Sequence, residues 1–173
     1  MDQGTAVHAS PPRRRIIRRP RLTTLLDASS ARVTVLLAAA GYGKTTLARE
    51  WLEQPGRDSS WLRITTSASD VAALALSLTF VAGRVTGYSS DRLPQWLRSV
   101  AEPAKETAAL STFVLDAFSQ WPSATWLVLD DYHLLTGSQA AEDLVAHLVQ
   151  NSDVPLLVTS RARPAWATAR RIL

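Results

Sequence analysis

The sequence predicts an α/β fold, built as a mainly parallel β-sheet with helices on both faces. Short apolar runs, of a length typical of buried strands, alternate along the chain with longer segments of helical periodicity. Three of these runs also end in distinctive polar residues. Parallel strands place their carboxyl ends on one edge of the sheet, where ligands bind in folds of this class.

Length and composition suit one folded domain. The chain has 173 residues, of which 46% are apolar, and this is sufficient for a core. It has no cysteine, which excludes a disulfide framework, a thiolate metal site and a cysteine nucleophile, and its three histidines are too widely spaced to suggest zinc. The longest apolar segment, Val71 to Ala82, is shorter than the ~18 residues of a membrane span. The arginines are not followed by the apolar run that a signal peptide requires, because Asp27 and Arg32 interrupt it. We therefore expect a cytoplasmic protein.

The net charge of +4 is concentrated near the N-terminus. Nine of the 19 lysines and arginines lie in residues 1–50, together with only three of the 15 acidic residues. We expect residues 1–18 to form a disordered basic arm and residues 19–173 to form the domain. The arm could make non-specific contact with nucleic acid, and the alternative is a solvated segment that leads into the domain.

The first half of the domain shows four elements in order. Leucines at helical spacing predict a short helix over residues 22–26, followed by a strand over Val33 to Ala38. Residues 46–53 carry their apolar side chains on one side, as in a helix that packs on a sheet. A second strand is expected from Trp61 to Thr65.

Three helices should follow before the next strand. Asp70 is placed to cap a long apolar helix that runs to about Val85, and Asp91 opens a shorter helix that ends before Pro103. Residues 104–121 match the i, i+3, i+4, i+7 pattern of an amphipathic helix closely.

The last part of the chain continues the alternation. Thr125 to Leu129 is a continuous apolar run, typical of a strand buried on both faces. A helix over residues 138–150 and a strand over residues 154–159 come next. Pro164 should begin a final helical stretch.

The loop after the first predicted strand has the pattern of a phosphate-binding loop. Gly41 and Gly43 permit backbone conformations that a Cβ would block, so successive N–H groups can point at phosphate oxygens, and the following helix adds its positive dipole end. Lys44 would reach the β- and γ-phosphates, and the Thr45 hydroxyl would bind Mg²⁺. The candidate nucleotide-binding residues are Ala40, Gly41, Tyr42, Gly43, Lys44, Thr45 and Thr46.

The full pattern has glycine where this chain has Ala38, a mild departure if the backbone there keeps ordinary β angles. The alternative interpretation is a glycine-containing turn whose lysine is only solvated. The strand before the loop and the amphipathic helix after it favour phosphate binding.

Two further strand ends carry candidate site residues. Asp130 is a natural Mg²⁺ partner, usually through a coordinated water, and Asp131 could orient or deprotonate the attacking water. The alternative for Asp131 is a carboxylate that caps the loop, and we interpret His133 as a supporting or surface residue. Arg161, which follows the last predicted strand, could sense the γ-phosphate or could be a plain surface charge.

Three motifs together resemble one family. AGYGKTTL at residues 40–47, LVLDDYHL at residues 127–134 and LVTSR at residues 157–161 occur in its order and at similar spacing. The chain resembles, from about Arg19 to Leu173, the N-terminal NTPase domain of the large ATP-binding LuxR-type regulators, a group of signal-transduction ATPases with numerous domains (STAND). The resemblance implies a P-loop NTPase fold that lacks the family's last strand, ATP and Mg²⁺ as ligands, and a role for Arg19 and Arg21 near the adenine.

The chain also departs from this family. Members commonly have an acidic turn after the second strand, whereas here residues 64–69 carry none of those acids. Members also continue for several hundred residues, and they self-assemble and bind DNA through the later domains. From the arginines of this chain we expect only non-specific contact with nucleic acid.

Two functions compete on this basis. The first is an ATP-binding, slowly hydrolysing module of a LuxR-type transcriptional regulator, whose nucleotide state gates assembly. The alternative is an autonomous P-loop kinase that phosphorylates a small molecule. A third possibility, a nucleic-acid-binding protein that acts through its basic arm, lacks any base-reading element in the sequence.

Overall fold

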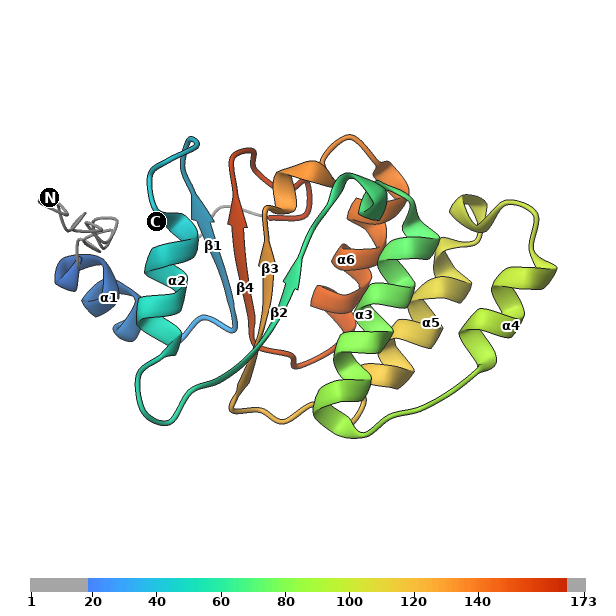
Figure 1. Ribbon diagram of the computed structural model, residues 1–173, viewed down its shortest axis with the longest axis horizontal. Coiled ribbons are helices and arrows are strands. Elements are labelled where there is room, and N and C mark those ends of the chain that lie inside the picture. The colour runs from blue at the N-terminus through green and yellow to red at the C-terminus, as the bar shows by residue number, and fades with distance from the viewer. Residues whose placement is uncertain (1–18, 168–173) are drawn as a thin grey trace, which may run out of the picture.

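The computed structural model describes residues 19–167, so the basic arm expected over residues 1–18 lies outside the described residues. The described chain alternates strands with α-helices and short 3₁₀ helices (η) (Figure 1). In order, these elements are α1 (Pro20–Asp27), β1 (Val33–Leu37), α2 (Lys44–Leu52), β2 (Asp58–Arg63), η1 (Thr66–Ser69), α3 (Val71–Thr86), α4 (Arg92–Ser99), η2 (Pro103–Lys105), α5 (Thr107–Phe118), β3 (Thr125–Asp130), η3 (Tyr132–Leu134), α6 (Gln139–Asn151) and β4 (Leu156–Ser160).

The four strands form one parallel sheet in the order β1-β4-β3-β2. This confirms the predicted α/β fold. Because the strands are parallel, the loop after β1 and the residues after β2, β3 and β4 all lie at one edge of the sheet.

Helices cover both faces of the sheet, as predicted. Helices α1 and α2 lie on one side, and α3, α5 and α6 lie on the other (Figure 1). The two faces have separate apolar cores, and side chains of β3 point alternately into them: Leu127 and Leu129 belong to the larger core, whereas Val128 packs with Leu47 and Trp51 of α2. Burial on both faces explains why β3 is apolar from Trp126 to Leu129.

Two predicted helix starts are confirmed by their capping contacts. The Asp70 carboxylate accepts a hydrogen bond of 2.9 Å from the Ala72 N–H at the start of α3. Ser138 accepts one of 3.4 Å from the Ala141 N–H at the start of α6. Each cap satisfies a backbone donor that the first turn of a helix leaves free.

The predicted start of β2 at Trp61 is wrong by three residues, because the strand begins at Asp58. The residues from Asp58 to Ser60 are polar and lack the composition of a strand, and it is pairing with β3 that extends them. The helical stretch predicted from Pro164 is also wrong over residues 164–167, which form a turn. The Ala165 N–H donates to the Glu142 carboxylate instead of starting a helix.

Within residues 19–167, no helix is long and apolar enough to cross a membrane.

Candidate nucleotide-binding site

The loop between β1 and α2 has the backbone that its glycines predict. Gly41 and Gly43 have φ angles of 80° and 77°, in the left-handed region that residues with a Cβ seldom adopt. Helix α2 begins at Lys44, so the positive end of its dipole points at the loop. The Lys44 ammonium donates to the carbonyls of Ala38, at 2.8 Å, and Ala39, at 3.0 Å, which places it across the loop.

Asp130 joins the loop to the centre of the sheet. This carboxylate is only 6% exposed, and its Oδ1 accepts hydrogen bonds from the Thr45 hydroxyl, at 2.8 Å, and the Thr159 hydroxyl, at 2.6 Å. Thr45 comes from the first turn of α2 and Thr159 from β4. The structure therefore brings together the two residues that the sequence assigned to Mg²⁺.

Asp131 points to a different side from Asp130. It has a φ of 62°, and its N–H donates a hydrogen bond of 3.1 Å to the Thr159 hydroxyl. Its Oδ2 lies 3.6 Å from Nε of Arg63, at the end of β2. Asp131 caps no helix with its side chain, so the alternative of a loop-capping carboxylate has no contact to support it among residues 19–167.

A cleft of about 490 Å³ opens beside these acids. Thr45, Asp130 and Asp131 line it, together with Arg63 and Arg49. The Arg49 guanidinium lies 5.4 Å from the ring centroid of Trp61 on β2. The cleft thus combines the predicted metal-binding edge with two cations.

A second, smaller cavity of about 110 Å³ lies on the other side of the loop, between it and α1. Leu22 and Leu26 of α1 and Tyr42 and Gly43 of the loop contribute to its mainly apolar lining. Arg19 also lines this cavity, and its guanidinium is 3.6 Å from where a Cβ on Gly43 would stand.

The remaining candidate residues line neither cavity. Arg21 and Arg161 are exposed and line neither of the two cavities, although Arg161 follows β4 directly at the same edge of the sheet. Ala40 and Thr46 are exposed on the loop and on the first turn of α2.

Sequence reasoning missed Thr159 and Arg63. Thr159 is fully buried and contacts both acids. In the sequence, however, it is merely the first of two polar residues that precede the more conspicuous Arg161. The adjacency of β3 and β4 places it beside the acids, and the sequence alone does not show this adjacency. Arg63 lies opposite Asp130 in the β2–β3 register, which the sequence alone likewise does not show.

A buried polar network lies behind the acids. Glu142 on α6 is 4% exposed, and its Oε2 accepts from the Tyr132 hydroxyl, at 3.1 Å, and from the Ala165 N–H, at 3.0 Å. The Trp166 indole donates to the Tyr132 oxygen at 2.7 Å. Burial raises the pKa of Glu142 and also that of Tyr132. This network attaches the segment after β4 to η3, which directly follows Asp131.

His133 is partly buried, and its Nδ1 has no hydrogen-bond partner among the described residues. Within residues 19–167, no group of three or more His, Cys, Asp or Glu side chains gathers that could hold a metal ion.

Comparison with known proteins relates this chain to a class of regulators. The HTH-type transcriptional regulator MalT of Vibrio campbellii is 31% identical to this chain over 157 residues, which cover 87% of this chain and 17% of MalT. MalT of Yersinia pestis is 28% identical over 155 residues, which cover 89% and 17%. The MalT regulators are homologues of this chain. It spans about one sixth of their length, and no protein-family model matches it.

A solved structure supports the MalT relationship at the level of the fold. A STAND protein with a tetratricopeptide repeat sensor from Pyrococcus horikoshii superposes with a TM-score of 0.51, at 17% identity, over 92% of this chain and 23% of its own. The fold is that of a STAND P-loop ATPase. The predicted resemblance to LuxR-type STAND regulators is confirmed by the MalT homologues and by this fold.

Proposed function

We propose that this chain is a cytoplasmic ATP-binding module of a STAND-type transcriptional regulator, that it hydrolyses ATP slowly, and that its nucleotide state gates assembly of the regulator. The observation that carries this proposal is the hydrogen bond of 2.8 Å between Thr45 and Asp130. It joins the phosphate-loop pattern to the acidic strand end, which are far apart in the sequence. A glycine-containing turn with a merely solvated lysine would not require a hydrogen bond between Thr45 and Asp130.

The residues at this edge fit ATP with Mg²⁺. A hydroxyl and a carboxylate are oxygen donors, which Mg²⁺ prefers, and one or two carboxylates suffice because the ion keeps several waters. Thr45 and Asp130 would hold the ion, which when bound would neutralise charge on the β- and γ-phosphates. Lys44 would exchange the carbonyls of Ala38 and Ala39 for phosphate oxygens, since all of these are acceptors for its ammonium.

The two sides of the loop would then hold the two ends of the nucleotide. Asp131 faces the cleft on the side of β2, where it would accept a proton from an attacking water, and Arg161 would contact the γ-phosphate. The cavity beside α1 would take the adenine, with Arg19 next to the loop and Arg21 outside the cavity. Its apolar walls suit the face of a planar base.

Titration of a fluorescent ATP analogue into the wild type and Lys44→Ala tests this function. The variant should bind at least about 10-fold more weakly, because a charge-assisted contact with phosphate is lost. Lys105→Ala is a matched control, since Lys105 is the other lysine of the sequence and lies on η2, outside both cavities. Equal affinities for all three proteins would remove the phosphate-loop assignment.

The cleft beside Asp131 also supports a second candidate, a P-loop kinase that phosphorylates a small molecule. With its two arginines and about 490 Å³, this cleft could receive an acceptor. Phosphate release with and without a panel of acceptor metabolites separates the two functions. Transfer to one acceptor would favour the kinase, whereas slow release that no acceptor changes would favour the regulator module.

A further inference from the structure

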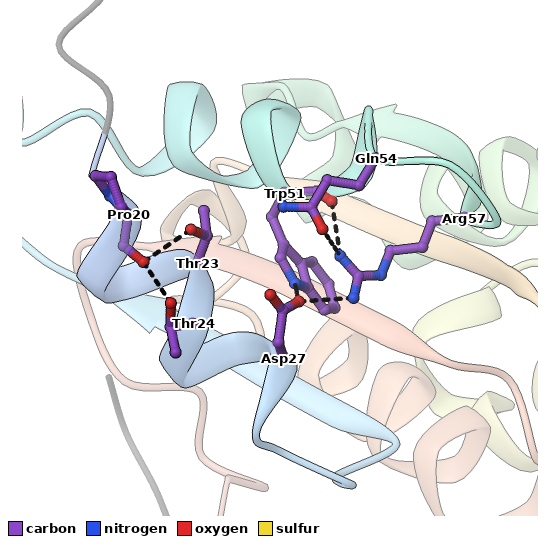
Figure 2. Close-up of polar contacts among 7 residues, drawn as sticks. All are labelled: Pro20, Thr23, Thr24, Asp27, Trp51, Gln54 and Arg57. Carbon is purple, nitrogen blue, oxygen red and sulfur yellow. Dashed lines mark hydrogen bonds and ion pairs between the residues drawn. The ribbon is translucent and has the colours of Figure 1, made fainter.

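One carboxylate oxygen at the end of α1 joins this helix to two other segments. Oδ1 of Asp27 accepts a hydrogen bond of 2.8 Å from the Trp51 indole and another of 2.7 Å from the Arg57 guanidinium (Figure 2). Trp51 belongs to α2 and is 3% exposed, and Arg57 lies between α2 and β2. Asp27 therefore fixes the last turn of α1 against α2.

The partners of Asp27 are themselves held in place. The other terminal nitrogen of Arg57 donates to the Trp51 carbonyl, at 3.0 Å, and to the Gln54 side chain, at 2.9 Å (Figure 2). The guanidinium stacks 4.4 Å from the centroid of the Trp51 ring, which meets Trp126 edge-on at 4.9 Å. The indole and guanidinium donors lower the pKa of Asp27, so its carboxylate is ionised at neutral pH.

Helix α1 forms one wall of the cavity assigned to the base. It lies outside the sheet, against α2 (Figure 1). It is eight residues long, and Leu26 is the residue of this helix that is buried in the core with Trp51 and Leu47. Thr23 and Thr24 both bond the Pro20 carbonyl, within the helix itself (Figure 2). Among residues 19–167, the side-chain hydrogen bonds that attach α1 to α2 and to the segment after it are those of Asp27.

We propose that Asp27 is a positioning residue for recognition of the nucleotide base. By fixing α1, it sets the place of Leu22 and Leu26, and with them the width of the cavity that would receive a planar heteroaromatic ring. The phosphate loop lies between β1 and the first residue of α2, whereas Asp27 contacts α2 at Trp51, near the other end of that helix. Loss of Asp27 should thus weaken binding of the base and leave binding of the phosphates unchanged. This inference rests on the proposed ATP-binding function.

Affinities of the 173-residue chain for ATP and for inorganic tripolyphosphate, both with Mg²⁺, test the proposal. Asp27→Ala should bind ATP about 10-fold more weakly, equivalent to ~1.4 kcal/mol, and tripolyphosphate within twofold of the wild type. Arg57→Gln removes the ion pair but keeps the indole contact, so it should show a smaller loss for ATP alone. Asp153→Ala, at an exposed residue between α6 and β4, is the matched control.

The possible results separate this inference from the proposed function. Equal losses for both ligands, or an ATP affinity that neither Asp27→Ala nor Arg57→Gln changes, would overturn the positioning role while ATP binding stands. If the wild type binds neither ligand, the proposed function fails and the inference falls with it. Should Asp27→Ala not fold, Arg57→Gln tests the positioning role, by its loss of affinity for ATP relative to its loss for tripolyphosphate.

Discussion

The hydroxyl of Thr159 on β4 donates a hydrogen bond of 2.6 Å to Asp130 on the neighbouring strand β3. The same hydroxyl accepts the N–H of Asp131 at 3.1 Å. One buried side chain thus fixes both acidic residues at once. Its donor and its acceptor functions are each used, so no apolar residue of the same shape can replace it fully.

Thr159→Val should therefore lower the free energy of unfolding by about 1–3 kcal/mol, because it removes a donor to the buried Asp130 carboxylate and leaves the part-buried N–H of Asp131 without its acceptor. It should also reduce Mg²⁺-dependent affinity for ATP, since Asp130 loses one of the two hydroxyls that orient it. Urea denaturation and nucleotide titration measure the two effects. Thr34→Val, at a buried position of β1, is the control, and equal stability of the two variants would contradict the role given to Thr159.

Asp130→Asn should remove most of the gain in ATP affinity that Mg²⁺ provides, by about 10-fold or more, because the amide lacks the charge that attracts a hydrated cation. Titrations with Mg²⁺ and with a chelator, on the same preparations, give this gain directly. Asp153→Asn provides a control with the same change of charge. A gain as large as that of the wild type would place the metal elsewhere.

Asp131→Asn should leave ATP bound but slow its hydrolysis by about 10²-fold or more, the usual scale for loss of a general base. Arg63→Gln is the control, because it removes the same ion pair and keeps the carboxylate. Exposed pairs contribute little to stability, typically about 0–1 kcal/mol, and Arg63 is 78% exposed. Wild-type turnover in Asp131→Asn, or an equal loss in Arg63→Gln, would show that Asp131 is no base.

Glu142→Gln should change how stability depends on pH. Burial raises the pKa of Glu142 above its ordinary 4.5, so the folded protein holds this proton more tightly than the unfolded chain does. The stability of the wild type should therefore fall as pH rises from about 4.5 through the raised value, whereas the neutral amide escapes this loss.

Thermal unfolding of the wild type and Glu142→Gln between pH 4 and 8 checks this expectation. A difference of ~1 kcal/mol at neutral pH would separate the two midpoints by roughly 2–4 °C. Glu50→Gln, on α2, controls for the loss of one carboxylate. Parallel curves for the wild type and Glu142→Gln would mean that Glu142 is not the group responsible.

The order of the elements could be predicted from the sequence because each prediction rests on local information. The apolar run from Thr125 to Leu129, the capping residue Asp70 and the helix start at Ser138 are recognisable within a few residues. The glycines of the phosphate loop, Gly41 and Gly43, are also recognisable from their immediate neighbours in the sequence. The edge of the sheet that carries the site then follows from parallel topology alone.

Features that depend on distant partners could not be predicted in this way. The first three residues of β2 extend because β3 lies beside them, and the turn at Ala165 is held by Glu142, which is 23 residues away. Strand register places Arg63 and Thr159 next to the acids at the end of β3. A single sequence shows the composition of such residues but not their neighbours.

The φ of 62° at Asp131 also restricts which residues can occupy that position. In the left-handed region, glycine is unstrained, asparagine and aspartate are tolerated, and β-branched residues are strongly disfavoured. In a library that samples every residue at position 131, folded clones should be confined to a narrow set, and only one member of that set bears a carboxylate. The backbone requirement can thus be met without the charge, so selection for folding and selection for catalysis can be separated at this single position.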